Sequence, residues 1–247
     1  MDKVKAGAQR LGLELGQDEL DMFETFCREL IDWNRRINLT SITDYDAVQV
    51  DHFLDALTVV LAWRPGSTLP RVIDVGTGAG IPGIPLKIAF PQIRLTLLEA
   101  TAKKAEFLRH IVGVLKLDAT EVVVGRAEDA ARLPQHREQY DLVLGRAVAK
   151  LATLAELTLP FCRVGGAVVT HKKVQIADEV EEAEFAIAAL GGKLKETVPV
   201  DLPEFPDNRC LVVMEKTSPT PEKYPRRAGV PTKKPLLVKS QALNTKS

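Results

Sequence analysis

Apolar side chains recur at helical spacing in the first quarter of the chain. Between residues 18 and 38 they lie three or four positions apart, and charged residues such as Glu24 and Arg28 fall between them. This spacing predicts an amphipathic helix. A second helical stretch is expected over about residues 45–62, where "RPGSTLP" breaks the pattern. Residues 1–65 are therefore predicted to form a helical cap.

From residue 71 onward the pattern changes to short β-type runs that alternate with helical stretches. Such alternation predicts a parallel sheet with helices on both faces. The predicted strands are 71–75, 94–99, 121–125, 140–145 and 165–172. The predicted helices are 82–90, 102–116, 127–133, 148–162 and 175–190.

The last two β-type runs break this alternation. Residues 193–202 and 210–216 follow each other with only the turn-rich "PEFPDNR" between them. A connection without a helix predicts an antiparallel pair at one edge of the sheet. The expected fold class is therefore α/β, with a Rossmann-like, mostly parallel seven-stranded sheet over residues 66–216, an antiparallel edge strand and the N-terminal cap.

Composition agrees with an ordinary globular protein. The 247 residues are 45% hydrophobic and 27% charged, with zero net charge. No apolar run reaches the ~18 residues that span a bilayer, and the first residues lack the apolar core of a signal peptide, so we expect a cytoplasmic protein without a membrane partner. Three dispersed cysteines outside any C-x-x-C pattern argue against disulfides or a metal site and are expected to be buried thiols: Cys27, Cys162 and Cys210.

The charge is unevenly distributed along the chain. Residues 217–247 carry seven Lys or Arg against one acid, together with five prolines. The prolines predict an extended segment rather than a helix. This basic, Pro-rich tail has two interpretations at this stage: a solubilising disordered end, or an arm that binds phosphates.

The densest glycine run follows the first predicted strand. "DVGTGAGIPG", residues 74–83, holds four glycines and a proline. Glycine is tolerated in such numbers where the backbone turns sharply or approaches a ligand, and in this kind of sheet the ligand crevice lies at the carboxyl ends of the strands. Gly78, Gly80 and Gly83 match the dinucleotide spacing G-x-G-x-x-G, with Glu99 placed 21 residues after Gly78.

A second register of the same loop reads Asp74-x-Gly76-x-Gly78-x-Gly80 and resembles the loop of class I S-adenosylmethionine methyltransferases. Three features favour it. An acid stands inside the strand before the first glycine, and Pro82 removes an N–H that a dinucleotide phosphate would need. The chain also ends on an antiparallel strand pair, without a separate substrate domain.

Other motifs fit this register. Glu99 would accept hydrogen bonds from both ribose hydroxyls, since a carboxylate has two acceptor oxygens. Ala127 and Glu128 of "GRAED" would flank the adenine, and Arg146 of "GRAVA" would stand at the rim of the crevice. Plainer interpretations are that Glu128 is an acid in the first turn of a helix, favoured by the helix dipole, and that Arg146 is a surface ion-pair partner.

Seven segments between about residues 20 and 237 together resemble the bacterial small-subunit ribosomal RNA guanine-N7 methyltransferases, also called glucose-inhibited division protein B. They are "WNRRINLTSI", "HFLDALTV", "DVGTGAGIPGIPLKI", "LLEATAKKAEFL", "GRAED", "GRAVAKL" and "YPRRAGVPTKKPL". The resemblance implies a class I methyltransferase domain and S-adenosylmethionine as cofactor. It implies as substrate one guanine in the decoding-region loop of 16S rRNA, position 527 in the usual numbering of that RNA. The implied cofactor contacts are Gly76, Gly78, Ile81, Glu99, Thr101, Ala127, Glu128 and Arg146; residue 99 is Glu where many relatives have Asp.

Guanine N7 carries a lone pair at neutral pH, so its methylation requires orientation of the reactants but no general base. No catalytic residue is assigned, and the scattered His52, His110, His136 and His171 are not expected to be catalytic. The expected partner is 16S rRNA or a precursor of the small ribosomal subunit, bound by a monomer. Cations predicted to contact the RNA are Lys103, Lys104, Lys172, Arg209, Arg226 and Arg227.

Two aromatic residues are candidates to stack on a base, although Trp33 is better explained as a core residue and Tyr224 lies in the tail. Two other functions stay open from the sequence. One is a class I methyltransferase that acts on a small molecule or a protein, against which the basic tail argues. The other is a nucleotide-sensing or RNA-binding module without chemistry, against which the intact glycine loop argues.

Overall fold

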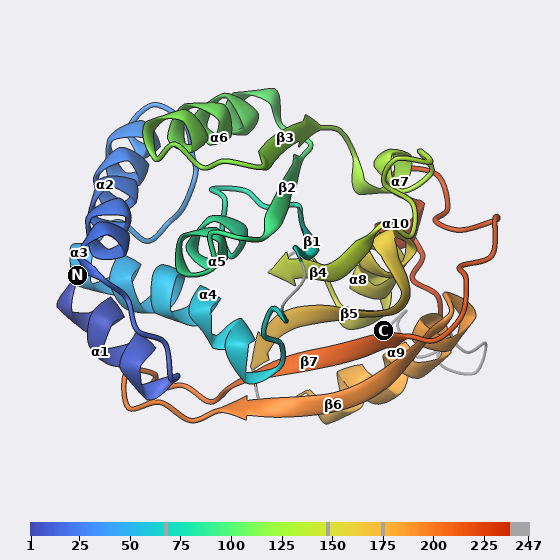
Figure 1. The fold of residues 1–247 in the computed structure, drawn as a ribbon. Helices are drawn as coiled ribbons and strands as arrows, with labels where there is room; N and C mark the ends of the chain where they lie inside the picture. Colours follow the sequence, from blue (N-terminus) through green and yellow to red (C-terminus); the bar gives the residue numbers. More distant parts are fainter. Residues whose placement is uncertain (67–68, 147–148, 174–175, 238–247) are drawn as a thin grey trace.

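The computed structural model describes residues 1–66, 69–146, 149–173 and 176–237 of the chain. Within these ranges seven strands form one sheet in the order β3-β2-β1-β4-β5-β7-β6 (Figure 1). The strands are β1 Arg71–Val75, β2 Arg94–Glu99, β3 Thr120–Val124, β4 Tyr140–Arg146, β5 Cys162–Lys173, β6 Gly192–Val200 and β7 Arg209–Lys216.

The strands β1 to β5 are parallel, whereas β7 is antiparallel to both of its neighbours, β5 and β6. The predicted antiparallel pair is thus confirmed, with β6 outermost and β7 the strand that runs against the others. The chain order reverses at β1, which lies between β2 and β4. In open sheets of this kind a ligand crevice forms where the order reverses, at the carboxyl ends of the strands.

Helices cover both faces because alternate side chains of each strand point to opposite sides. Val72 joins the apolar cluster on one face and Ile73 the cluster on the other; Leu142 and Val143 divide in the same way. The first cluster packs against the N-terminal helices, and the second packs against the last helices of the sheet domain. The helices of the sheet domain are α5 Gly83–Ala89, α6 Ala102–Val114, α7 Ala127–Ala130, α8 Leu151–Thr158 and α9 Ala177–Ala189.

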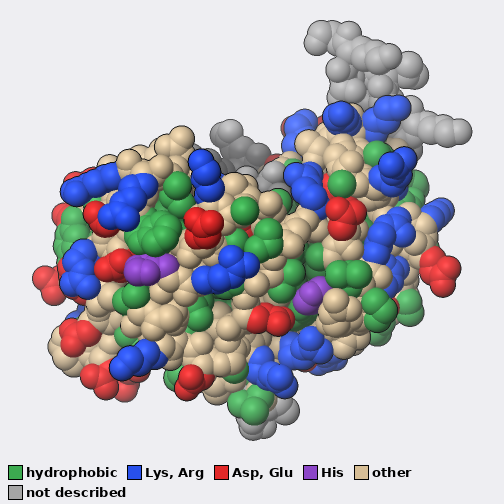
Figure 2. All heavy atoms as spheres, turned by 90° about the horizontal axis from the view of Figure 1, so that it is seen from above, with side chains coloured by type: hydrophobic (Ala, Val, Ile, Leu, Met, Phe, Trp, Pro, Cys, Tyr) green, Lys and Arg blue, Asp and Glu red, His purple; other side chains and the backbone are tan. Residues whose placement is uncertain are grey.

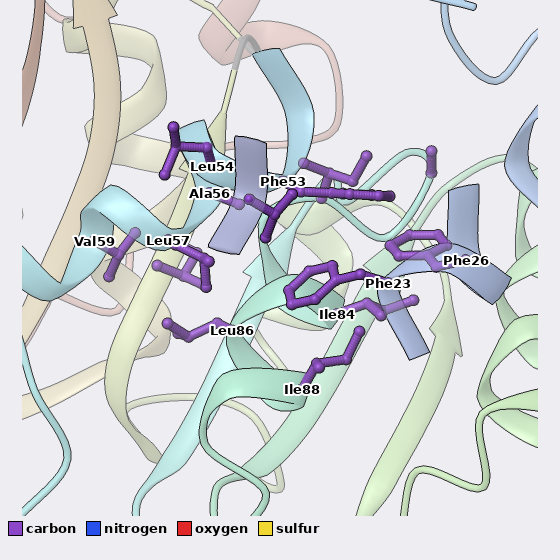
Figure 3. Close-up of a cluster of buried hydrophobic side chains, with 14 of the residues drawn as sticks. Phe23, Phe26, Phe53, Leu54, Ala56, Leu57, Val59, Ile84, Leu86 and Ile88 are labelled. Atoms are coloured by element: carbon purple, nitrogen blue, oxygen red, sulfur yellow. The ribbon is translucent and has the colours of Figure 1, made fainter. Parts of the chain in front are cut away.

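The N-terminal cap is helical, as predicted, but it is more divided than the sequence pattern suggested. Its helices are α1 Asp2–Arg10, α2 Gln17–Asn34, α3 Tyr45–Ala47, a π-helical segment Val48–Leu54, α4 Asp55–Leu57 and a 3₁₀ turn Thr58–Leu61. Phe23 and Phe26 of α2 pack on Phe53, with ring centroids 5.2 Å apart in both pairs, above Ile84 of α5 (Figure 3). Cap and sheet therefore share one core, and the division at residue 65 stays a prediction.

The C-terminal segment packs on the sheet domain up to residue 237. Tyr224 is 9% exposed and belongs to the apolar cluster that also contains α8 and α9 residues. A short helix, α10 Val230–Lys233, interrupts the extended course that the prolines predicted. A wholly disordered end is therefore not what residues 217–237 form, whereas residues 238–247 lie outside the described part of the chain.

Candidate active site

The glycine loop begins where β1 ends, and its shape depends on glycine. Gly76, Gly78 and Gly80 have φ values of +68°, +60° and +86°, a region that residues with a Cβ rarely adopt. Gly76 N–H donates to Leu98 O at 2.9 Å, which ties the loop to β2. A Cβ at Gly78 would meet no atom within 4 Å. The loop thus presents bare backbone to open space, as a closely approaching ligand requires.

The side chain of Asp74, in β1, holds the glycine loop through hydrogen bonds. The side chain is fully buried, and its Oδ2 accepts hydrogen bonds from Thr77 Oγ1 at 2.6 Å and Gly83 N at 2.9 Å. Burial raises the pKa of Asp74 to about 6, against the opposing effect of these two hydrogen bonds. Its Oδ1 is buried without a hydrogen-bond partner. The acid before the first glycine therefore fixes the loop against the start of α5.

Glu99, at the end of β2, faces the same loop. Its Oε2 accepts from Gly78 N at 3.0 Å and its Oε1 accepts from Thr101 N at 2.8 Å, and the residue is only 6% exposed. A carboxylate oxygen accepts two hydrogen bonds, so each oxygen keeps one free acceptor position. Two such positions side by side match the two neighbouring hydroxyls of a ribose, which supports the predicted role of Glu99.

A hollow opens beside these groups at the ends of β1, β2 and β3. Of the predicted cofactor contacts it brings together Gly76, Ala127 and Glu128. Ile81 lies elsewhere, since its side chain is buried in the core cluster beneath the loop. The hollow is lined by Val75, Gly76, Leu98, Ala100, Gly125, Arg126, Ala127, Glu128 and Leu157.

The Glu128 carboxylate is held by the chain itself. The side chain is 2% exposed, and its Oε1 accepts from Gly229 N at 2.7 Å and from Arg126 at 3.3 Å. Burial alone would raise the pKa of Glu128, but these hydrogen bonds outweigh it and the pKa is lowered. The carboxylate is therefore ionised at neutral pH and fixes the C-terminal segment to α7.

Arg146, the last residue of β4, lines a second hollow, whose other residues come from the N-terminal cap, from β5 and from the chain at the start of β7. Its Nε lies 3.3 Å from Asp55 Oδ2, and one terminal nitrogen donates to Asp51 O at 2.6 Å. The other terminal nitrogen is buried without a partner. This open hollow of about 440 Å³ is lined by Ile42, Asp51, Asp55, Arg146, His171, Lys172, Asp207 and Arg209.

Two of the predicted RNA contacts in this hollow are engaged by acids. Arg209, at the start of β7, lies 2.6 Å from Asp51, 3.0 Å from Asp55 and 2.7 Å from Asp207. Lys172 of β5 lies 2.6 Å from Glu179 of α9. The second hollow is therefore a network of ion pairs, and its predicted RNA contacts stay predictions.

The two histidines near this network carry no charge at neutral pH. Burial and the charge of Arg146 lower the pKa of His52 to about 4, and its Nε2 lies 2.7 Å from Thr40 Oγ1. Burial lowers the pKa of His171, whose Nε2 donates to Asp55 O at 2.8 Å. Neutral imidazole rings that are hydrogen-bonded within the protein agree with a site that orients its reactants and transfers no proton.

The remaining predicted cations differ in exposure. Lys103 and Arg227 are exposed, Lys104 is half-buried, and Arg226 forms an ion pair with Glu156 at 2.6 Å. Seen from above, Lys and Arg side chains gather towards the right of the molecule, the side on which α7, α10 and the C-terminal segment lie in Figure 1 (Figure 2). These placements leave Lys103, Lys104 and Arg227 available for phosphates.

Other sequence predictions concern groups away from the two hollows. All three cysteines are buried, and burial raises the pKa of Cys27 to about 11 and that of Cys162 to about 12. Trp33 is half-buried and packs on Phe107 of the core, and Tyr224 is buried rather than free to stack. In the described ranges no cluster of three or more metal-binding side chains forms, and no helix has the length and apolarity to cross a membrane.

Sequence reasoning did not single out Asp51 and Asp55, which organise the second hollow. The signal that was available is the isolation of these acids among the apolar residues of "VDHFLDALTVV". An acid at a buried helical position needs a cation, because an unpaired buried charge is costly. The π-helical segment Val48–Leu54, which contains Asp51, could not be recognised from the spacing of apolar residues in the sequence.

Comparison with known proteins identifies the family. Residues 19–204 match the family model described as rRNA small subunit methyltransferase G. The chain is 51% identical to ribosomal RNA small subunit methyltransferase G of Dehalococcoides mccartyi (strain CBDB1), over 96% of this chain and 100% of the relative. It is 50% identical to the protein of the same name from Roseiflexus castenholzii, with the same coverage.

Solved structures agree in fold. A geranyl diphosphate methyltransferase superposes with a TM-score of 0.54 over 82% of this chain and 100% of that chain, at 13% identity. Protein Atu636 of Agrobacterium tumefaciens, described as a predicted O-methyltransferase, gives 0.52 over 66% and 81%, at 20% identity. These matches confirm the class I methyltransferase fold.

The family match sets aside the dinucleotide register of the glycine loop, a small-molecule or protein methyltransferase, and a binding module without chemistry. The chain belongs to the rRNA small subunit methyltransferase G family, enzymes that methylate 16S ribosomal RNA with S-adenosylmethionine as cofactor.

Proposed function

We propose that this enzyme methylates N7 of a single guanine of 16S rRNA, the one at position 527 in the usual numbering, with the cofactor at the first hollow and the guanine at the second. The observation that carries the proposal is the strand order, in which β1, followed by the glycine loop, lies between β2 and β4. Glu99 is the last residue of β2, and Arg146 is the last residue of β4. A cofactor on the loop and a base at Arg146 would therefore be neighbours.

We assign the adenosine part of the cofactor to the first hollow and to Glu99, which follows Leu98 of its lining. Glu99 offers two free acceptor positions for the ribose hydroxyls, and Gly76, Ala127 and Leu157 supply a small, mostly apolar wall. Bare backbone at Gly78 leaves room for the methionine part. We assign Thr101 to the ribose through its link with Glu99, and we assign Ile81 to loop support because its side chain lies in the core.

The second hollow fits a base. Guanine has N–H donors on its Watson–Crick edge, while N7 and O6 are acceptors on the opposite edge. The Asp51 carboxylate is 35% exposed and suits the donor edge, and the unpartnered nitrogen of Arg146 suits O6. This orientation would direct N7 away from Asp51 and towards the cofactor.

No proton transfer is needed in the reaction. S-adenosylmethionine supplies a methyl group on a positively charged sulfur. The N7 lone pair forms the new N–C bond, the electrons of the C–S bond return to sulfur, and the positive charge passes to the purine. The contribution of the protein is orientation, which can lower a barrier by several kcal/mol, up to about 7–11 in ideal cases. The neutral His52 and His171 agree with this.

Phosphate binding is assigned first to the side chains that reach solvent, Lys103, Lys104 and Arg227. Lys172 and Arg209 are proposed to line the base hollow, where their ion pairs keep Asp51 and Asp55 in position. We further propose that the enzyme acts as a monomer in the cytoplasm, on free RNA or on a precursor particle.

The test is methylation by the purified protein. 16S rRNA and small subunits, both prepared from cells that lack the gene, are incubated with tritium-labelled cofactor, and the labelled nucleotide is identified by mass spectrometry. We expect one N7-methylguanine, and a loss of at least tenfold in rate for Arg146→Ala and Asp51→Asn. Arg94→Ala is the matched control, because this exposed arginine is the first residue of β2, at the opposite end of that strand from Glu99.

Label in another base, or in a small molecule, would overturn the proposal. Equal rates for Arg146→Ala and Arg94→Ala would refute the placement of the guanine in the second hollow.

A further inference from the structure

The C-terminal residues 220–231, named the strap here, lie across α7 and α8 (Figure 1). The loop that follows α7 holds the start of the strap: Arg137 donates to Thr220 O at 2.7 Å and to Tyr224 O at 3.0 Å, and Arg132 donates to Pro225 O. Three main-chain carbonyls fixed by two arginines define a built interface, well beyond what a solubilising end requires.

The strap is joined to α8 by one buried carboxylate. Glu156 is 0% exposed, and it accepts from Arg226 N at 2.8 Å, from Arg226 Nε at 2.9 Å and from a terminal nitrogen of the same arginine at 2.6 Å. A bidentate Arg–carboxylate pair with an added main-chain donor fixes both position and direction. The next residue of α8, Leu157, lines the first hollow.

The strap is joined to α7 by a second buried carboxylate. Gly229 N donates to Glu128 Oε1 at 2.7 Å, and Glu128 lines the same hollow. Gly229 has φ +80°, a conformation that aims its N–H at Glu128 and that other residues rarely adopt. Two walls of the hollow, one on α7 and one on α8, are therefore tied to strap residues that lie only three positions apart, Arg226 and Gly229.

We propose that the strap is part of the cofactor site: it sets the separation of the α7 and α8 walls, and Arg226 is a positioning residue for the adenosine part of S-adenosylmethionine. This inference rests on the proposed cofactor site at the first hollow. It gives Arg226 a different role from Arg227, its neighbour, whose side chain is exposed and stays with the phosphates.

Buried charge explains why the strap matters at this place. Without Arg226, the carboxylate of Glu156 would be left buried without its cation, an expensive state that the helix relieves by shifting or by taking up water. Either response moves Leu157 and widens the hollow. Cofactor affinity would fall while the guanine hollow, built from other elements, would keep its shape.

Coupling between two sites is reciprocal, so the cofactor must in turn stabilise the strap. Lys223 and Arg227 are exposed cleavage sites for trypsin within the strap. We expect saturating S-adenosylmethionine to slow cleavage there at least threefold, and to leave cleavage at the exposed Lys116, at the end of α6, unchanged.

The decisive experiment compares Arg226→Gln with Arg227→Gln. The first is expected to raise the KM for S-adenosylmethionine at least tenfold with kcat changed less than threefold, and to leave the salt dependence of RNA binding unchanged. Arg226→Lys, which keeps a cation beside Glu156, should recover part of the affinity. Arg227→Gln is expected to leave the KM for the cofactor unchanged and to flatten the salt dependence.

A second pair of variants covers the case in which Arg226→Gln does not fold. Gly229→Ala strains the backbone at the residue whose N–H donates to Glu128, although the added Cβ meets no atom within 4 Å. This variant should raise the KM for the cofactor at least threefold. Gly165→Ala places the same strain at φ +82° on β5, away from the strap, and should not.

The outcomes separate the two proposals. The proposed cofactor site would be refuted if the wild-type protein did not bind S-adenosylmethionine, or if the Glu99→Ala variant bound it as tightly as the wild type does. Wild-type binding that is weakened by Glu99→Ala but unchanged by both strap variants would refute the strap alone.

Discussion

Glu99→Ala is the sharpest single test of the proposed cofactor site at the first hollow. The side chain is 6% exposed and its two oxygens accept Gly78 N at 3.0 Å and Thr101 N at 2.8 Å. Removal of the carboxylate therefore takes away the two acceptor positions proposed for the ribose and, at the same time, the link between the glycine loop and the end of β2. Gln is no conservative replacement, because its NH₂ group would face one of these two N–H donors.

The magnitude follows from the kind of hydrogen bond that is lost. A bond to a charged group contributes about 1.5–3 kcal/mol net. With about 1.4 kcal/mol per factor of ten, loss of one such bond alone raises the Kd for S-adenosylmethionine about 10- to 150-fold, so Glu99→Ala, which removes both, should raise it at least about tenfold. Gly78 is half-buried and Thr101 exposed, so water can replace the carboxylate at both N–H groups. The free energy of unfolding should then fall by only about 1 kcal/mol.

Calorimetric titration with the cofactor measures the effect, and thermal unfolding verifies that the variant folds. Glu106→Ala, an exposed glutamate of α6, is the matched control and should bind as the wild type does. A folded Glu99→Ala variant whose Kd stays within a factor of two of the wild-type value would refute the assignment of Glu99 to the ribose.

Three further predictions address other parts of the molecule. Because burial raises the pKa of Asp74 to about 6, the free energy of unfolding of the wild type should fall relative to Asp74→Asn as pH rises from 4 to 6, by up to about 1.4 kcal/mol per pH unit; parallel curves from urea denaturation would contradict this. Phe53→Ala, which empties a fully buried site between two phenylalanine rings, should lower the free energy of unfolding by about 3–5 kcal/mol, and a loss below about 1 kcal/mol would be inconsistent with the packing. The double variant Lys103→Gln, Lys104→Gln should flatten the slope of log K against log salt for RNA binding by about 0.7–0.9 per lost phosphate contact, whereas Lys116→Gln at the other end of α6 should not; equal slopes for both variants would exclude phosphate contacts there.

Local patterns were sufficient to predict the sheet. Each predicted strand overlaps an observed one, as residues 94–99 do with β2, because each leaves a short β-type run bounded by turn residues or by a helical pattern. The glycine loop and Glu99 were predictable for a related reason. Both stand where a strand ends, and strand ends can be read from the sequence.

Contacts between distant segments could not be predicted in this way. Arg226 and Glu156 are 70 residues apart, and nothing local to "YPRRAG" distinguishes the arginine that binds a buried carboxylate from its exposed neighbour. The single acid in the apolar α8 was the available hint. Composition indicated a mobile or phosphate-binding tail, whereas packing of Tyr224 and the two buried carboxylates made residues 220–231 part of the domain.

The central claim is that this enzyme places a methyl group on N7 of one guanine in 16S rRNA. The most direct measurement maps N7-methylguanine along 16S rRNA from cells with and without the gene, by chemical cleavage at the methylated base and by mass spectrometry of the fragments. The account predicts that one N7-methylguanine, in the decoding-region loop, disappears with the gene and returns when the gene is restored. Identical maps from the two strains, or a loss of methyl groups at other atoms only, would contradict it.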